Sequence, residues 1–279
     1  MLAGDTKILS LFGWPVGHSL SPVIFNTTFE KLGTKRTYLP FSVAKTDLKR
    51  AVEAARVLGF EGFNVTMPHK IAIMEMLDEL DETAEKSGAV NTVSSTKEGL
   101  VGHNTDGVGA ELALKAYHIS PRDKRILLIG AGGAARAIVH RLTADGSRIR
   151  ILDRSLQRAR DTADKADGPG ATSFDELVKK TLEDSFHDSD IIINATPIQT
   201  TTIVDQLGIP VALLEKVDWV FDLAYDNSPA QFPGRTGRIS PLEMLVQQAA
   251  LSYQLWFKEA APLSLMRSAL VDHLGRDWK

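Results

Sequence analysis

Four short segments rich in Gly and Pro carry the polar residues best suited to binding or catalysis. They are Gly13–Pro22, Gly62–Lys70, Gly88–Thr92 and Gly102–Gly107. Their Ser, Thr, Asn, Lys and Asp side chains are types that bind carboxylates and hydroxyls or act as general acids and bases. In an open parallel sheet, ligands bind at the carboxyl ends of the strands. We therefore expect a small-molecule site built from these segments.

A second set of residues has the spacing of a phosphate-binding turn. Within Ile126–Ala137, the pattern Gly130-x-Gly132-x-x-Ala135 fits G-x-G-x-x-G/A. The first Gly permits the turn, the second brings backbone close to a pyrophosphate, and the Ala allows close helix–strand packing. The free N–H groups and positive dipole end of the following helix attract phosphates. Because a predicted strand and a predicted helix flank the turn, it indicates a dinucleotide site.

Asp153 ends the next predicted strand, about 20 residues beyond the Gly turn. A carboxylate at this place accepts hydrogen bonds from the ribose hydroxyls and repels a 2′-phosphate, which favours NAD over NADP. Arg154 complicates this interpretation, since it either stacks on adenine or reaches a 2′-phosphate. An alternative role for Asp153 is to cap the helix that begins near Ser155.

Alternating strands and helices must position these residues. Apolar runs predict strands at Ile8–Phe12, Tyr38–Val43, Gly62–Thr66, Val90–Ser94, Arg125–Ile129, Arg148–Leu152, Asp190–Asn194 and Trp219–Leu223. Helical spacing predicts helices at Pro22–Leu32, Asp47–Leu58, Pro68–Leu80, Gly133–Ala144, Ser155–Ala166 and Leu242–Phe257. This alternation predicts an α/β protein with βαβ units and a parallel sheet.

The composition excludes several classes of protein. The 279 residues are 43% hydrophobic and 24% charged, as in ordinary globular proteins, and the formal net charge is −3. This balance argues against a nucleic-acid partner. The absence of Cys excludes disulfides and cysteine-ligated zinc. No apolar run approaches the roughly 18 residues that span a membrane, so we expect a cytoplasmic protein with no membrane partner.

The four polar segments, together with Gly130–Ala137 and Met244–Gln248, resemble the shikimate dehydrogenase family, which includes the quinate/shikimate dehydrogenases. The resemblance runs from about Leu11 to Trp256. It implies an N-terminal α/β substrate domain at 1–106, completed by C-terminal helices at 241–279. It also implies a Rossmann-type parallel-sheet domain at 107–240 that binds the dinucleotide.

The resemblance implies reversible NAD(P)-dependent hydride transfer between shikimate or quinate and its 3-dehydro form, a reaction of aromatic amino acid biosynthesis. Lys70 and Asp106 match the catalytic pair that assists proton transfer. The family's substrate contacts fall on Ser19, Ser21, Asn64, Thr66, Asn91, Tyr225 and Gln248. Its cofactor contacts fall on Gly130, Ala131, Gly132, Gly133, Ala134, Asp153, Arg154, Thr196, Pro197, Leu223 and Met244. No metal is implied, since the nicotinamide carries the chemistry.

Residue types alone leave structural roles open for several of these positions. Ser19 and Ser21 can both donate to one carboxylate, or they can form a turn and helix cap before Pro22. Asn64 and Thr66 share one side of a strand, either as ligand contacts or as an ordinary polar face. An isolated lysine is usually a solvated surface residue.

The sequence departs from the family pattern mainly on the cofactor side. Asp153-Arg154-Ser155 stands where NADP-using members usually have Asn-Arg-Thr, so we expect NAD, with NADP less favoured. Ile198 and Gln199 replace a usual Gly-Met, and Pro241 replaces a usual Gly.

Three alternative functions compete with this interpretation, and the departures motivate the first of them. One is a dinucleotide-binding regulatory paralogue without turnover, and another is a dehydrogenase of an amino-substituted shikimate analogue. A third is a different two-domain enzyme such as methylene-tetrahydrofolate dehydrogenase, against which the Ser19-x-Ser21 pair argues. The expected partner is a small hydroxycyclohexene or hydroxycyclohexane carboxylate, and the sequence is compatible with a homodimer.

Overall fold

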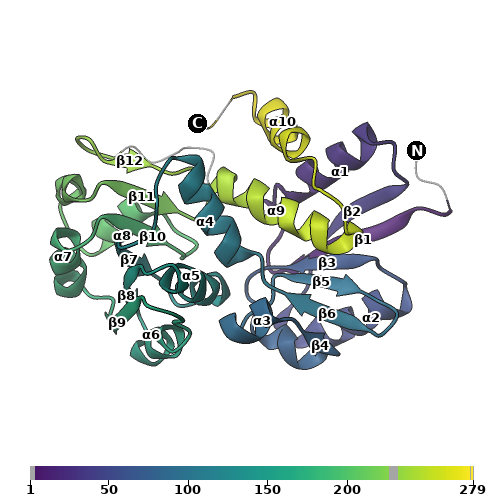
Figure 1. Ribbon diagram of the computed structural model, residues 1–279, viewed down its shortest axis with the longest axis horizontal. Helices are drawn as coiled ribbons and strands as arrows, with labels where there is room; N and C mark the ends of the chain where they lie inside the picture. Colours follow the sequence, from purple (N-terminus) through teal and green to yellow (C-terminus); the bar gives the residue numbers. More distant parts are fainter. Residues whose placement is uncertain (1–3, 226–231, 277, 279) are drawn as a thin grey trace. The chain divides into compact units, whose positions relative to one another are not determined.

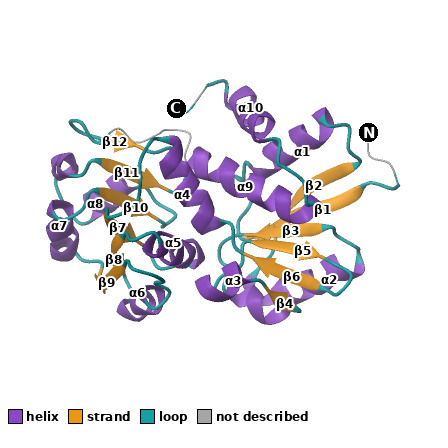
Figure 2. Cartoon of the chain, viewed as in Figure 1, coloured by secondary structure: helices purple, strands orange, loops and turns teal. Residues whose placement is uncertain are grey.

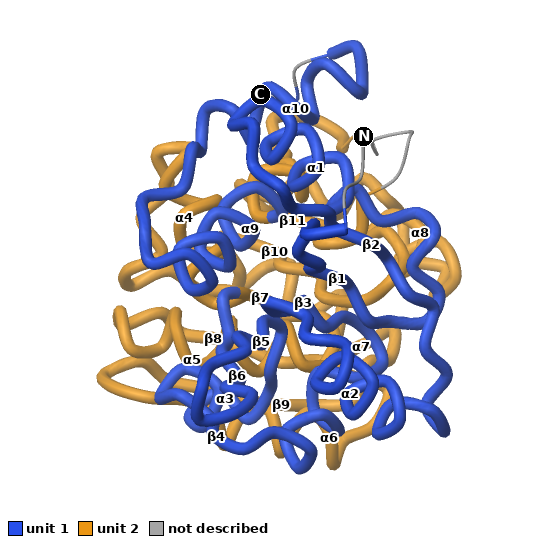
Figure 3. The backbone as a smooth tube through the Cα atoms, turned by 90° about the vertical axis from the view of Figure 1, so that its right-hand side faces the viewer, with its two compact units in different colours: residues 1–105, 245–279 blue, residues 106–244 orange. Residues whose placement is uncertain are grey.

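Two six-stranded sheets organise the computed structural model, which describes residues 4–225, 232–276 and 278 (Figures 1 and 2). The chain divides into two compact units, drawn in blue and orange in Figure 3. Unit 1 comprises Met1–Thr105 and Leu245–Lys279, and unit 2 comprises Asp106–Met244. Each unit holds one of the sheets.

Unit 1 contains a mixed sheet of strand order β2-β1-β3-β5-β6-β4. Its strands are β1 (Lys7–Gly13), β2 (Arg36–Ser42), β3 (Gly62–Val65), β4 (Glu79–Leu80), β5 (Thr92–Ser95) and β6 (Leu100–His103). Its helices are α1 (Ser21–Lys31), α2 (Leu48–Val57), α3 (Glu82–Ser87), most of α9 (Pro241–Phe257), α10 (Leu263–Leu274) and the 3-10 helices η1 (Lys45–Asp47) and η2 (Ala72–Met76).

The strand directions in unit 1 bring several polar segments together at the ends of neighbouring strands. β1 runs parallel to β2 and β3, whereas β5 is antiparallel to both β3 and β6. Asn64 near the end of β3 therefore pairs with Thr92 at the start of β5, and Thr92 pairs with His103 at the end of β6. The prediction of parallel pairing was wrong for β5. It pairs antiparallel with β6 because the short Thr96–Gly99 turn joins the two strands, and a tight reversal can only join antiparallel strands.

Apolar side chains cover both faces of the sheet of unit 1. One face packs Phe12, Phe63 and Val93 with α2 residues such as Leu48 and Val52. The other meets aromatic residues of α1 and α9. Phe25 stacks on Tyr38 with ring centroids 4.6 Å apart, and Trp256 lies 5.3 Å from Phe25. The C-terminal part of α9 therefore completes a core that begins with the first strands of the chain.

Unit 2 contains an all-parallel sheet of strand order β12-β11-β10-β7-β8-β9. Its strands are β7 (Arg125–Ile129), β8 (Arg148–Asp153), β9 (Ala171–Glu176), β10 (Ile191–Asn194), β11 (Trp219–Asp222) and β12 (Gly237–Arg238). Its helices are α4 (Asp106–Ala116), α5 (Gly133–Ala144), α6 (Leu156–Ala163), α7 (Lys179–His187), α8 (Thr200–Gln206), the 3-10 helix η3 (Val211–Lys216) and the first residues of α9.

Alternate residues along β7 serve different cores, as expected for a sheet covered on both faces. Ile126 and Leu128 pack with residues of α4, α5 and α6. Leu127 and Ile129 pack with residues of α7, α8 and η3. The turn after β7 and the start of α5 thus rest on a doubly covered parallel sheet, which is the Rossmann-type arrangement expected from the sequence.

The helix predicted at Pro68–Leu80 was wrong. Only Ala72–Met76 forms a 3-10 helix, and Glu79–Leu80 forms a strand that pairs with β6. The carbonyl of Lys70 accepts a hydrogen bond from Val90, and Asp78 exchanges backbone and side-chain hydrogen bonds with Leu100. These tertiary hydrogen bonds replace those that a helix would make. None of the helices in the described ranges is long and apolar enough to cross a membrane.

Candidate active site

Asn64 is the centre of a buried polar cluster in unit 1. Its side chain is 5% exposed. Its Oδ1 accepts a hydrogen bond from the Tyr38 hydroxyl at 2.8 Å. Its Nδ2 faces three acceptors within 3.1 Å, namely the carbonyl of Asn91 and the hydroxyls of Thr92 and Ser252. Every polar atom of Asn64 therefore has a partner within the protein, and these bonds fix its rotamer.

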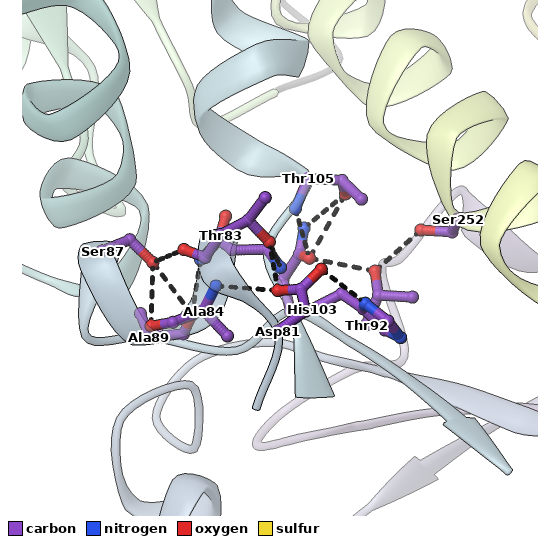
Figure 4. A network of polar contacts seen from close by, with 11 residues as sticks. Asp81, Thr83, Ala84, Ser87, Ala89, Thr92, His103, Thr105 and Ser252 are labelled. Carbon is purple, nitrogen blue, oxygen red and sulfur yellow. Dashed lines mark hydrogen bonds and ion pairs between the residues drawn. The ribbon is translucent and has the colours of Figure 1, made fainter. Parts of the chain in front are cut away.

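Asn91 extends this cluster toward Thr105, which follows β6. Figure 4 shows Thr92, Thr105 and Ser252 of this network. Its Nδ2 donates to the Thr105 hydroxyl at 2.8 Å, and its Oδ1 accepts the Thr105 backbone N–H at 2.9 Å. The carbonyl of Gln248 in α9 accepts from the hydroxyls of Thr105 and Ser252 at 3.2 and 3.0 Å. The structure thus gathers Asn64, Asn91 and Gln248, three positions predicted to contact substrate, around one network.

The remaining predicted positions of unit 1 lie on the loops after β1 and β3. Ser21 begins α1, and its backbone N–H donates to the Ser19 hydroxyl at 3.3 Å. Thr66 follows β3, and its backbone N–H donates to the carbonyl of Phe12 at 2.8 Å, which ties it to the end of β1. Lys70 is half-buried in the loop before η2. The side chain of Thr66 lies so close to Gly13 that a Cβ there would clash with it.

A second polar network joins α3 to the end of β6 (Figure 4). Asp81 caps α3 by accepting the Ala84 N–H at 3.0 Å, and its other oxygen lies 2.7 Å from Nδ1 of His103. Burial raises the pKa of Asp81, but hydrogen bonds from His103, Thr83 and Ala84 outweigh burial and leave the pKa below its ordinary value. This acid is therefore held in its ionised form.

The Gly-rich turn of unit 2 has the geometry that a dinucleotide requires. Gly130 has φ +100°, and a Cβ there would approach Thr196 at 3.1 Å. Gly132 is the N-cap of α5, makes no side-chain cap, and a Cβ built on it meets no atom within 4 Å. The free N–H groups of the first turn of α5 thus face space at Gly132. The turn therefore leaves room for a ligand beside the first turn of α5.

Asp153 connects this turn to the start of α6. Its Oδ2 accepts the Ala131 N–H at 3.0 Å, and its Oδ1 accepts the Ser155 N–H at 2.9 Å. Arg158 lies 3.6 Å from Oδ2, and Arg154 is exposed. Ser155, and not Asp153, is the N-cap of α6. A carboxylate has about four acceptor positions, so Asp153 keeps acceptor capacity beyond these two bonds.

The loop after β10 is shaped by a buried network that the sequence did not indicate. Asp222 Oδ1 accepts hydrogen bonds from Asn194 and from both the N–H and the hydroxyl of Thr200. Thr196 in turn donates its hydroxyl to Asn194 at 2.7 Å. Pro197 follows in this loop and is exposed. The network fixes the loop that carries two predicted cofactor contacts.

Four further predicted positions of unit 2 lie at element ends. Leu223 and Tyr225 follow β11 and are half-buried, and Met244 is buried in the first turn of α9. Asp106 is the first residue of α4 and is 4% exposed. Gly107 follows it because α4 crosses α5 closely there: a Cβ would lie 2.4 Å from the Ala137 carbonyl.

Sequence analysis missed the partners that orient the predicted residues, including Tyr38, Thr105, Ser252, His103 and Asp81. Only Thr105 and His103 stood inside a segment singled out by its composition. Ser252 lies 188 residues from Asn64, so no local pattern links them. Across the described ranges, no group of three or more His, Asp or Glu side chains is placed to hold a metal ion.

Three family models match successive parts of the chain. The shikimate dehydrogenase substrate binding domain matches residues 11–93. The shikimate / quinate 5-dehydrogenase model matches residues 111–225. The shikimate 5′-dehydrogenase C-terminal domain matches residues 242–271.

Individual relatives align over nearly the whole chain. A shikimate dehydrogenase (NADP+) of Methanocaldococcus jannaschii is 36% identical over 99% of this chain and 100% of its own length. A shikimate dehydrogenase solved with NADP+ is 34% identical, with a TM-score of 0.81 and 98% of each chain covered. The shikimate 5-dehydrogenase of Listeria monocytogenes, solved with shikimate and NAD, is 30% identical, with a TM-score of 0.82 and 96% of this chain and 98% of the other covered.

Proposed function

Because this chain belongs to the shikimate dehydrogenase family, we propose that it interconverts shikimate and its 3-dehydro form as an NAD(P)-dependent oxidoreductase. The observation that carries this proposal is the alignment with a shikimate dehydrogenase along 99% of this chain and 100% of the relative. A nicotinamide dinucleotide would supply the hydride acceptor or donor when bound. The chain's own residues must bind the ring acid, orient it and move the hydroxyl proton.

We assign substrate binding to polar residues of unit 1 together with Tyr225. The hydroxyls of Ser19 and Ser21 bind the carboxylate, as neighbouring donors can. The ring hydroxyls contact Asn64, Thr66, Asn91, Tyr225 and Gln248. Support comes from the hydrogen bonds that hold Asn64 and Asn91 in single orientations, since preorganised polar groups lose little entropy on binding.

We assign proton transfer to Lys70 and Asp106. Oxidation of a secondary alcohol breaks the O–H bond as the carbonyl forms, so the proton must pass to a positioned acceptor. An amine and a carboxylate are both suitable groups. The reverse reaction returns the proton to the carbonyl oxygen.

We assign the dinucleotide to the turn after β7 and the loops beside it. The turn formed by Gly130, Ala131, Gly132, Gly133 and Ala134 would hold the pyrophosphate, with backbone N–H groups at the start of α5 as donors, which the open space at Gly132 supports. Asp153 and Arg154 would bind the adenosine ribose. Thr196, Pro197, Leu223 and Met244 would hold the nicotinamide end.

We further propose that NAD is preferred over NADP. Asp153 is 7% exposed and has two backbone donors but retains acceptor capacity for ribose hydroxyls. A 2′-phosphate beside this carboxylate would place two anions together with little water between them, which is unfavourable. Arg158 already pairs with Asp153, so this carboxylate partly neutralises the positive charge of Arg158.

Initial rates of nicotinamide reduction with each combination of shikimate or quinate and NAD or NADP test these assignments. We expect the highest kcat/KM with shikimate and NAD. No turnover in any combination would contradict the dehydrogenase function. A preference for NADP would leave that function standing and contradict the role of Asp153, and a preference for quinate would change the substrate alone.

A further inference from the structure

His103 at the end of β6 makes an unusual buried contact. The residue is 7% exposed, and its Nδ1 lies 2.7 Å from Oδ2 of Asp81. Its Nε2 is buried and has no hydrogen-bond partner among the residues that the structure describes. Because a carboxylate only accepts, the tautomer with the proton on Nδ1 fits this contact. The side chain therefore directs one hydrogen bond toward Asp81 and makes no other.

Asp81 and its neighbour Thr83 attach the start of α3 to three successive residues. The backbone N–H of Asp81 donates to the Gly102 carbonyl at 2.9 Å. The carboxylate of Asp81 accepts from His103, and the Thr83 hydroxyl accepts the Asn104 N–H at 2.8 Å. The same hydroxyl donates to Asp81 Oδ1 at 2.6 Å. Residues 102 to 104 thus lie against α3 through both backbone and side chains.

The other side of this segment is held by the loop before β5. The Asn91 N–H donates to the His103 carbonyl at 3.1 Å, and the Asn104 side chain donates to the Ala89 carbonyl at 2.8 Å. The next residue, Thr105, makes the two bonds with Asn91 described above. Asp106 follows in the chain. The segment 102–104 is therefore followed by Thr105, which bonds the proposed substrate contact Asn91. The proposed catalytic residue Asp106 comes directly after Thr105.

We propose that His103 is a positioning residue, whose bond to Asp81 holds Asn104 and Thr105 in the register that orients Asn91 and delivers Asp106. This inference rests on the proposed dehydrogenase function. Loss of the bond leaves the buried segment attached by fewer groups, and small displacements of reacting or binding groups lower turnover steeply.

Steady-state kinetics of three variants test this role. His103→Leu removes the donor, and we expect it to lower kcat/KM for shikimate about 10-fold to 100-fold per folded molecule. His103→Asn keeps an N–H donor near the position of Nδ1 and should restore most of this loss. Thr83→Val, at an exposed position, removes the bond to Asn104 and should lower kcat/KM about 3-fold to 10-fold.

His140→Leu is the matched control, because it removes a His–Asp pair in unit 2, with 3.8 Å between His140 Nδ1 and Asp167. We expect unchanged kinetics. In all variants the KM of the dinucleotide should stay within about twofold, since the proposed effect concerns the ring substrate. A residue with a merely structural role would lower thermal stability and leave kcat/KM per folded molecule unchanged.

Either of two results would overturn the proposal: normal kcat/KM in folded His103→Leu, or a loss in His103→Asn as large as in His103→Leu. If His103→Leu does not fold, normal kinetics of Thr83→Val overturn it instead. Kinetics of the unsubstituted protein distinguish a failure of the proposed function from a failure of the proposed role of His103. Failure of that protein to oxidise shikimate contradicts the proposed function, whereas its turnover beside unaffected variants contradicts only the role of His103.

Discussion

Asn91 and Thr105 hold each other by hydrogen bonds in opposite directions. The side-chain amide of Asn91 donates to the Thr105 hydroxyl through Nδ2, and the backbone N–H of Thr105 donates back to Oδ1 of Asn91. The Thr105 hydroxyl also reaches the carbonyl of Gln248 in α9. This pair links the strands of unit 1 to the helix contributed by the C-terminal part of the chain.

Thr105→Val removes the hydroxyl and leaves the Asn91 amide short of an acceptor. Since one hydrogen bond contributes about 1 kcal/mol, we expect kcat/KM for shikimate to fall roughly 5-fold to 10-fold. Thr28→Val is the matched control, because the buried Thr28 hydroxyl donates to the Ile24 carbonyl of its own helix at 2.7 Å. Equal kinetics of the two variants would show that Thr105 has no part in orienting Asn91.

Lys70→Ala and Asp106→Ala should each reduce kcat by about 100-fold or more, because each removes a group assigned to the hydroxyl proton. Circular dichroism and thermal unfolding should show a retained fold. Lys97→Ala, at an exposed position in the turn between β5 and β6, controls for the loss of a lysine. Near-normal turnover in both variants would contradict the proposed mechanism.

Asp153→Asn should raise the ratio of kcat/KM for NADP to that for NAD by about 10-fold, because it removes the charge that repels a 2′-phosphate. Asn keeps one carbonyl oxygen, so one of the two backbone N–H groups, Ala131 or Ser155, loses its acceptor. Unfolding curves measured beside the kinetics separate this structural cost from the change in preference. An unchanged ratio would mean that Asp153 only maintains the shape of the Gly-rich turn.

The buried Glu111 in α4 supplies a test of stability. It bonds Lys115 and lies 2.6 Å from Nε of Arg141 in α5. Arg141→Met should lower the free energy of unfolding by about 1–3 kcal/mol, because it leaves the carboxylate with one partner. Glu111→Gln should cost less, since the Arg141 side chain is 36% exposed and its charge can be hydrated.

The dependence of stability on pH follows from the ion pair between Glu111 and Arg141. Burial raises the pKa of Glu111, but hydrogen bonds from Arg141 and Lys115 lower it below its ordinary 4.5. The stabilisation is therefore present above that ordinary value and is lost as pH falls through the lower pKa of the folded protein. Denaturation at neutral and acid pH should show the difference between the unsubstituted protein and Glu111→Gln shrinking in acid. A constant difference would contradict the ion pair as its cause.

Strong local patterns made parts of the fold predictable. β7 and α5 occupy the predicted residues, because an apolar run, a Gly turn and a small-residue helix follow one another there. β9 was missed because it is an edge strand whose residues are mostly exposed and carry no apolar alternation. The Pro68–Leu80 helix was wrong because hydrogen bonds to distant strands compete with helical ones.

The candidate site was predictable as residue types and not as a network. Ser19, Asn64, Asn91 and Lys70 stand in segments whose composition singles them out. The partners that orient them are ordinary residues such as Tyr38 and Ser252, reached across 26 and 188 residues from Asn64. The functional roles of all these positions stay predictions until the variants are measured.

The route of the chain through the two units sets an order for biosynthesis. Unit 2 is continuous in sequence, whereas unit 1 needs Leu245–Lys279 in addition to its first 105 residues. A ribosome makes the chain from its N-terminus, so all the strands of unit 2 are synthesised before Ser252 and Trp256. Until then, Asn64 lacks its hydrogen bond to Ser252, and the Val93 carbonyl lacks the one from Trp256. The N-terminal part of unit 1 therefore lacks the aromatic packing that α9 gives to one face of its sheet until Leu245–Lys279 has been synthesised.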